Sequence, residues 1–147
     1  MQTTTDQFNP LLLENQLCFP LYAASKEVTK RYKPFLDPLG LPYTQYIVMM
    51  ALWEHDNVAV RELGDRVLLD SATLTPLLKR LESRGYITRT RSEVDERSVI
   101  IALTDEGREL RERALSVPKS LGGCIHLEKE EATALKQLLE KLLATLE

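Results

Sequence analysis

The sequence is poor in the residues that build disulfide scaffolds and metal sites. Its 147 residues include two cysteines and two histidines. A disulfide-stapled secreted domain or a structural zinc site needs more of them. The densest apolar stretch, Tyr46 to Trp53, is too short to span a bilayer, and the N-terminal residues lack the pattern of a secretory signal. We therefore expect a cytoplasmic protein with reduced thiols, no metal, no cofactor and no membrane partner.

The sequence also lacks a strong excess of charge of either sign. It has 19 basic and 22 acidic residues, for a net charge of -3, which excludes a polybasic binder. The charge is nevertheless uneven, because residues 71–91 contain five basic residues and one acidic residue, Glu82. Such a region is either a solvated helix face or a footprint for phosphates, and charge alone does not distinguish the two.

Apolar periodicity predicts six helices in one domain spanning residues 1–147. Pro34 is expected to bend or end the first helix, and Thr44 to cap the second. Asp70 and Ser71 supply a cap for the fourth helix, and Gly85 ends it. The residues from Pro118 to Gly123 are expected to end the fifth helix. The predicted helices cover residues 17–39, 44–53, 60–68, 71–84, 105–117 and 132–146.

Two strand-like segments, Tyr86–Arg91 and Val99–Leu103, flank a charged loop of seven residues. They predict a two-stranded ribbon with a projecting tip. A short helix, a turn, a basic helix and a hairpin follow one another in the order of a winged helix-turn-helix. The predicted fold is therefore mainly α with a small β-hairpin wing (α+β). Its parts are N-terminal helices over 11–57, a DNA-binding region over 58–103 and C-terminal helices over 104–147.

This arrangement predicts contacts with double-stranded operator DNA. The fourth helix suits a major groove, and the hairpin tip suits a neighbouring minor groove. The alternative is that Thr73 and Thr75 only cap the helix and that Arg97 only forms a surface pair. The predicted DNA-binding residues are Ser71, Thr73, Thr75, Lys79 and Arg80 in the helix, and Arg89, Arg91, Asp95 and Arg97 in the hairpin.

The first and last predicted helices carry more apolar surface than a winged module needs. Two-fold proteins read two half-sites, so these helices are expected to form a homodimer. The alternative is that both helices pack onto their own subunit.

Several segments together resemble the MarR family of bacterial regulators. The most specific are Asp-Glu-Arg at 95–97 and Leu-Thr-Asp-Glu-Gly at 103–107, and residues 70–82 and 85–87 also fit. Residues 13–19, 32–34 and 43–46 resemble one branch, the OhrR-type organic-hydroperoxide-sensing repressors. The resemblance covers residues 11–147.

The resemblance implies a dimeric, non-enzymatic repressor whose inducers are organic hydroperoxides. In this branch the cysteine matching Cys18 is the redox sensor, and two tyrosines of the partner subunit, matching Tyr32 and Tyr43, contact its sulfur. Tyr22, one helical turn from Cys18, is a third candidate. Some members have a second cysteine near the position of Cys124, which forms an intersubunit disulfide after oxidation. The match implies this two-cysteine type, in which oxidation releases operator DNA.

The residues themselves support part of this mechanism and leave alternatives open. Pro20 is tolerated best in a first turn, which places Cys18 near a helix N-terminus, where an anion is favoured. Two glycines before Cys124 indicate a hinge. The sequence is also compatible with an inert core Cys18, an incidental Cys124 or pairing within one chain. The alternative functions are a ligand-responsive MarR regulator with non-redox cysteines and a thiol peroxidase, which the absence of an arginine near Cys18 in sequence disfavours.

Overall fold

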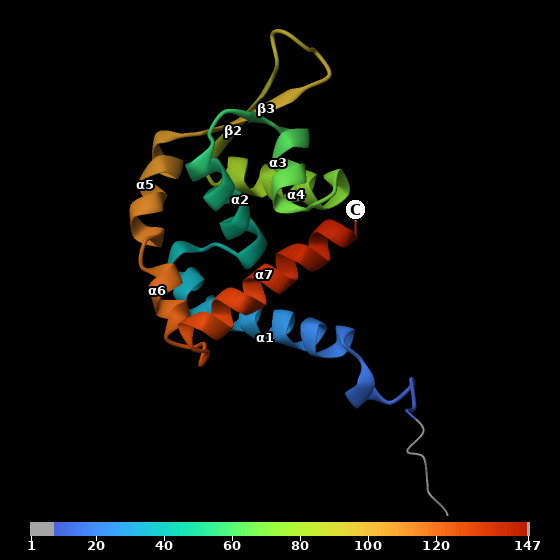
Figure 1. Cartoon of the computed structure of the whole chain (residues 1–147). Helices are drawn as coiled ribbons and strands as arrows, with labels where there is room; N and C mark the ends of the chain where they lie inside the picture. The colour runs from blue at the N-terminus through green and yellow to red at the C-terminus, as the bar shows by residue number, and fades with distance from the viewer. Residues whose placement is uncertain (1–7, 147) are drawn as a thin grey trace, which may run out of the picture.

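The computed structural model describes residues 8–146 and consists of seven α-helices around a small antiparallel sheet (Figure 1). None of the described helices is long and apolar enough to cross a membrane. Two short 3-10 helices, η1 and η2, flank the first long helix. In chain order the elements are η1 (Leu13–Asn15), α1 (Cys18–Leu36), η2 (Asp37–Leu39), α2 (Tyr43–Glu54), β1 (Val58–Ala59), α3 (Val60–Val67), α4 (Ser71–Ser83), β2 (Ile87–Arg91), β3 (Val99–Leu103), α5 (Asp105–Ala114), α6 (Val117–Gly122) and α7 (Lys129–Thr145).

The helices confirm the predicted order but correct two of its details. Pro42 takes the N-cap position of α2, so the predicted cap Thr44 is instead the second residue of that helix. The segment from Pro118 to Gly123, predicted to end the fifth helix, mostly forms the separate helix α6. Pro118 lies in its first turn, where the missing N–H of proline leaves no helical hydrogen bond unmade.

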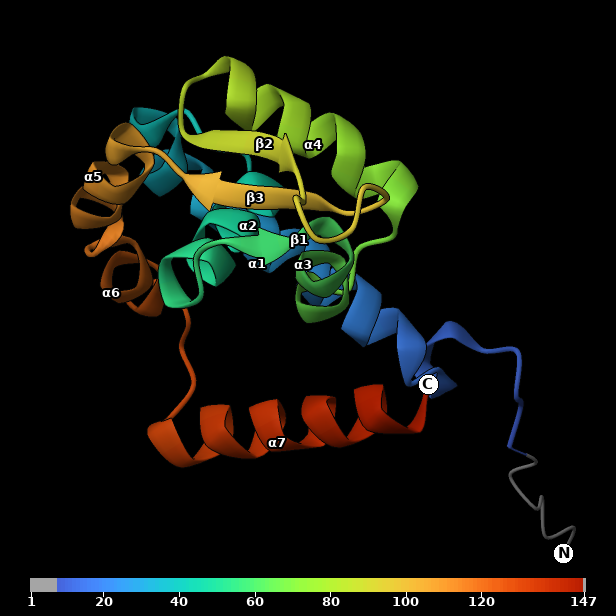
Figure 2. The ribbon, with the colours of Figure 1, turned by 90° about the horizontal axis from the view of Figure 1, so that it is seen from above.

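The predicted two-stranded ribbon is part of a three-stranded sheet of order β1-β3-β2. The β2–β3 pairing runs from Ile87 opposite Leu103 to Arg91 opposite Val99. On its other edge β3 pairs with β1, which has only two residues. A strand that short carries no periodicity, so its existence depends on the partner strand. Figure 2 shows the sheet between α4 and α3, and Figure 1 shows the wing tip extending past both helices.

One hydrophobic core holds the winged region and the N-terminal helices together. It includes Leu36, Tyr46, Leu63, Leu81 and Ile101, each no more than 2% exposed. Thus α1, α2, α3, α4 and β3 all contribute to the same core, and the predicted DNA-binding elements pack on the helices that precede them.

The fourth helix ends as the sequence predicts, at a glycine in the left-handed conformation. Gly85 has a φ of 81°. Its N–H donates to the carbonyl of Glu82 at 2.9 Å, and the N–H of Tyr86 donates to the carbonyl of Leu81 at 3.1 Å. This is the Schellman pattern, and it turns the chain from α4 directly into β2.

The last helix, α7, stands apart from the rest of the chain (Figure 2). Within the described chain it buries none of its residues. Leu135, Leu138, Leu143 and Leu146 are between 48% and 71% exposed. The N-terminal end of α1 is also apolar and uncovered, with Leu17 76% and Phe19 45% exposed. The predicted apolar surplus of the terminal helices therefore lies on the surface of the single chain.

Candidate nucleic-acid interface and thiol site

The fourth helix presents one polar face to solvent. Its leucines are buried, and the carboxylate of Asp70 caps its N-terminus by accepting a hydrogen bond from the backbone N–H of Thr73 at 2.8 Å. This bond, reinforced by further hydrogen bonding from Thr73, lowers the pKa of Asp70. The cap expected at Asp70 is confirmed. The predicted DNA-contacting residues of this helix, Ser71, Thr73, Thr75, Lys79 and Arg80, are all exposed.

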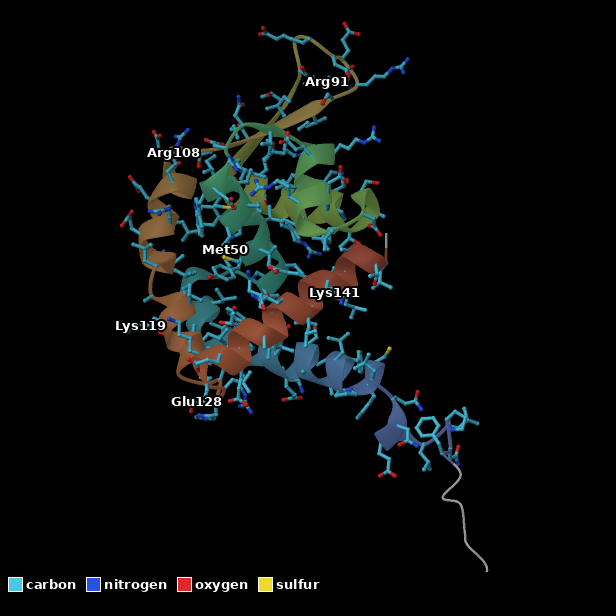
Figure 3. All side chains as sticks on the ribbon, viewed as in Figure 1. Met50, Arg91, Arg108, Lys119, Glu128 and Lys141 are labelled. Atoms are coloured by element: carbon cyan, nitrogen blue, oxygen red, sulfur yellow. The ribbon has the colours of Figure 1, made fainter. Side chains whose placement is uncertain are left out.

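The tip of the wing is ordered by short polar side chains. Ser92 Oγ accepts hydrogen bonds from the backbone N–H groups of Val94 and Asp95, each at 3.2 Å. The Asp95 carboxylate in turn accepts from the backbone N–H of Arg97 at 3.1 Å. Asp95 thus fixes the backbone that carries Arg97, whose side chain is exposed. Arg91, at the end of β2, extends from the base of the wing in Figure 3.

A cleft of about 760 Å³ separates the wing from α3 and α4. It brings together five of the nine predicted DNA-binding residues, which the sequence distributes over 27 positions. Two further charged residues line it from α3, Arg61 and Asp65, and no spacing in the sequence marks them. The predicted DNA-binding residues in its lining are Ser71, Thr75, Arg89, Asp95 and Arg97.

Arg89 differs from the other predicted DNA contacts because its charge is already engaged. Its guanidinium lies 3.1 Å from Glu82 Oε1, and its backbone N–H donates to Glu82 Oε2 at 3.1 Å. The hydrogen bond from Arg89 lowers the pKa of Glu82. Arg89 therefore ties the first wing strand to α4, and the positive region of the sequence has less free charge than its count of arginines indicates.

Cys18 is the first residue of α1 and is exposed. The prediction that it lies at a helix N-terminus is confirmed. Its surroundings are apolar, with Leu17 before it and Phe19 after it. Tyr22 is 61% exposed, and its ring lies 5.2 Å from Lys26 Nζ.

Tyr32 and Tyr43 pack against each other, with their ring centroids 4.7 Å apart. The buried ring of Tyr46 completes the cluster at 5.7 Å from Tyr32 and 6.4 Å from Tyr43. Burial, with a smaller effect of the two neighbouring phenols, raises the pKa of Tyr32 to about 12. Tyr46 was not among the predicted site residues, although it lies one helical turn after Tyr43. The pair lines an open, largely apolar cavity of about 460 Å³ between α1 and α2.

Cys18 lies far from this pair within one chain. Fourteen positions separate Cys18 from Tyr32 on α1, which corresponds to about 21 Å along the helix axis. A contact between the Cys18 sulfur and these phenols is therefore possible only between two subunits.

Cys124 follows α6 and is also an exposed free thiol. Its backbone N–H donates to the carbonyl of Leu121 at 2.8 Å, and its sulfur lies 3.8 Å from the carbonyl oxygen of Ser120. Gly122 is the last residue of α6, and Gly123 has ordinary helical dihedrals, so the expected hinge has a helical backbone here. Figures 1 and 2 both place the α6–α7 junction away from the N-terminal end of α1, a helix about 28 Å long. This arrangement does not bring the two cysteines of one chain within disulfide range, about 7 Å between Cα atoms.

Known proteins match the chain over nearly its whole length. Residues 30–114 match the family described as transcriptional regulator SarA/Rot. The chain is 50% identical over 141 residues to the organic hydroperoxide resistance transcriptional regulator of Bacillus subtilis, covering 96% of both.

Solved structures of AbfR from Staphylococcus epidermidis also match the chain over most of its length. Reduced AbfR bound to DNA is 38% identical, with a TM-score of 0.78 over 91% of this chain and 92% of that one. Disulfide-formed AbfR is 37% identical but has a TM-score of 0.61 over 91% and 89%. The chain belongs to the MarR family of winged helix-turn-helix transcriptional regulators.

Proposed function

We propose that this regulator is a homodimeric repressor that binds operator DNA and senses organic hydroperoxides through Cys18. The observation that carries the proposal is the position of Cys18, which is both exposed and the first residue of α1. The N–H groups of a first turn favour negative charge, and an exposed thiolate is the form that attacks a peroxide. Neighbouring Leu17 and Phe19 favour an oxidant with an apolar organic group.

The first chemical step is a two-electron oxidation of the Cys18 sulfur. The thiolate attacks the terminal peroxide oxygen, the O–O bond breaks, and the sulfur takes that oxygen as sulfenic acid. The organic group leaves as its alcohol after gaining a proton, so one thiol and one hydroperoxide give one sulfenic acid and one alcohol. No cofactor enters the balance.

The tyrosine pair of the partner subunit holds the thiolate before this step. A phenol donates a hydrogen bond only while it is protonated, and the raised pKa of Tyr32 keeps it protonated over the physiological range. The cavity that Tyr32 and Tyr43 line has room for the incoming sulfur and for the apolar part of a hydroperoxide. Tyr22 lies one helical turn after Cys18 on the same helix and serves as a third hydrogen-bond donor to the thiolate.

Cys124 of the partner subunit resolves the sulfenic acid. Its thiolate attacks the Cys18 sulfur, the hydroxyl leaves as water after protonation, and an intersubunit disulfide forms. The placement of both thiols supports pairing between subunits, because α1 separates them within one chain. Oxidation then releases the DNA that α4 and the wing hold. The conformation of this chain resembles reduced, DNA-bound AbfR more closely than disulfide-formed AbfR, so it corresponds to the DNA-binding state of this proposal.

The proposal is tested by operator binding measured by fluorescence anisotropy before and after cumene hydroperoxide is added. The wild type should release the DNA, and Cys18→Ser should retain it. Release by Cys18→Ser would refute the proposed sensor. Cys124→Ser serves as the matched cysteine control, since it should release DNA but give no intersubunit cross-link on a non-reducing gel.

A response to a small aromatic ligand is the second candidate function, and one observation favours it. A mainly apolar cavity of about 350 Å³ lies between α2, α5 and α6, lined by Met50, Trp53 and Leu115 among others (Figure 3 labels Met50). Quenching of the Trp53 fluorescence by salicylate, with release of DNA under reducing conditions, would support this function over peroxide sensing.

A further inference from the structure

Two arginines from distant parts of the chain hold the turn between α1 and α2. Arg113 of α5 donates a hydrogen bond to the carbonyl oxygen of Pro38 at 2.7 Å. Arg84 donates to the carbonyl oxygen of Leu39 at 3.3 Å and to that of Gly40. Three successive backbone carbonyls are therefore bound by two guanidinium groups. We call this arrangement, Arg84 and Arg113 on residues 38–40, the arginine clasp.

The turn held by the clasp joins the two helices that carry the tyrosine pair. Tyr32 lies one helical turn before the end of α1, and Tyr43 is the first residue of α2. Pro38 and Pro42 fix the φ angles at two positions of the turn, which makes it stiff. A displacement of either tyrosine is therefore passed on to the turn rather than absorbed within it.

On its other side the clasp is attached to the DNA-facing elements. Arg84 is the C-cap residue of α4, and its backbone N–H donates to the carbonyl of Arg80 at 3.1 Å. Its guanidinium lies 5.0 Å from the ring centroid of Tyr86, the residue before β2. Arg113 lies on α5, which follows β3. The clasp thus connects the turn to the C-terminal end of the DNA-reading helix and to both strands of the wing.

We propose that Arg84 and Arg113 are positioning residues that couple the thiol site to the orientation of α4. The inference rests on the proposed function and assigns the coupling to named contacts. In the reduced dimer, the tyrosine pair binds the partner thiolate, and the clasp holds α4 and the wing in the DNA-binding orientation. When the Cys18 sulfur leaves the tyrosines and α1 moves, the turn moves with it. The bound guanidinium of Arg84 then carries the end of α4 along.

A static role for the clasp makes different predictions. If the arginines only cap exposed carbonyls, their loss lowers stability and weakens operator binding equally in the reduced and oxidised protein. If they couple the two sites, their loss changes the ratio of the two affinities. The deciding quantity is therefore the ratio of operator dissociation constants, oxidised over reduced.

This ratio should be measured by anisotropy for the full-length wild type, Arg84→Gln, Arg84→Lys and Arg113→Gln, oxidised with cumene hydroperoxide. Arg84→Gln should reduce the ratio about tenfold, within the roughly 5- to 150-fold range of allosteric couplings. Arg84→Lys should give an intermediate ratio, because an ammonium lacks the planar fork that binds two carbonyls at once. The rate of Cys18 oxidation should not change in any variant.

Arg108→Gln is the matched control, because Arg108 also lies on α5 but pairs with Asp105 and Asp56 rather than with the turn. Its ratio should equal that of the wild type. A wild-type ratio in every clasp variant, with lower melting temperatures alone, would overturn the coupling role while leaving the sensor intact. A wild type that keeps its DNA after oxidation would instead overturn the proposed function, and the role of the clasp with it.

Discussion

Replacing Leu138 by alanine should weaken the dimer while leaving the folded subunit intact. Leu138 lies in the middle of α7 and is 65% exposed in the single chain. Its side chain therefore contributes little to the stability of the isolated subunit. In a two-fold interface formed by α7, the same side chain is buried once in each subunit.

The expected loss follows from the exposed fraction. Fully burying a leucine side chain stabilises by about 1.5–3 kcal/mol, and two thirds of that is about 1–2 kcal/mol per subunit. Counted twice, the loss is about 2–4 kcal/mol, or about thirty- to a thousandfold in the dimer dissociation constant. Because alanine retains the Cβ atom, the expected loss of dimer stability lies toward the lower end of this range.

Sedimentation equilibrium over a dilution series measures this constant directly. Lys136→Ala is the control, because Lys136 pairs with Glu140 along the polar side of the same helix. It should leave the dimer constant unchanged. An unchanged constant for Leu138→Ala, or an equal effect of both substitutions, would refute the assignment of the leucine face to the interface. A large drop in the circular dichroism of the variant at concentrations where it is still dimeric would show instead that Leu138 supports the fold of its own subunit.

Three further predictions concern single contacts. Trp53→Phe removes the indole N–H that donates to the Gly107 carbonyl at 2.8 Å, and it should lower the unfolding free energy in urea by about 0.5–1.5 kcal/mol. The cap lowers the pKa of Asp70, so the stabilisation from its carboxylate is present above the ordinary carboxyl pKa and is lost as the pH falls through the lowered value. Asp70→Asn should therefore reduce the fall of the melting temperature at acidic pH. An equal fall in the wild type and the variant would contradict the role of the cap. Burial raises the pKa of Tyr32 from 10.0 to about 12, so its stabilisation is complete below pH 10 and lost toward pH 12. Tyr32→Phe should remove one of the phenolate transitions that an absorbance titration shows above pH 10.

The parts of the fold that were predicted from sequence are those whose signals are local. The leucine spacing of α4, its Asp70 cap and its terminal Gly85 all act within a few residues, and each is found where expected. The same holds for the strands β2 and β3 and for the position of Cys18 at a helix start. Local rules also failed at Thr44, because Pro42 is better suited to precede the first turn of α2.

The features that the sequence did not predict depend on residues far apart in the chain. β1 exists because β3 offers it a free edge, and two residues carry no pattern of their own. Arg84 and Arg113 are 44 and 75 positions from carbonyls that they bind, and nothing near either arginine in the sequence indicates these partners. The pairing of Arg89 with Glu82 was not predicted for the same reason, because it forms only when β2 packs beside α4.

Two independent features of the single chain support the proposed dimer. The leucines of α7 and the apolar N-terminal end of α1 lie uncovered, which is unfavourable in water unless another surface covers them. Separately, about 21 Å of helix lies between the proposed sensor, Cys18, and Tyr32, one of the two phenols proposed to bind its thiolate. Burial and chemistry are unrelated demands, yet both are met when the terminal helices of two chains pack together and each supplies the tyrosines for the other. Dimerisation would then complete the thiol site, and a variant that weakens the dimer, such as Leu138→Ala, should also slow the oxidation of Cys18 at low protein concentration.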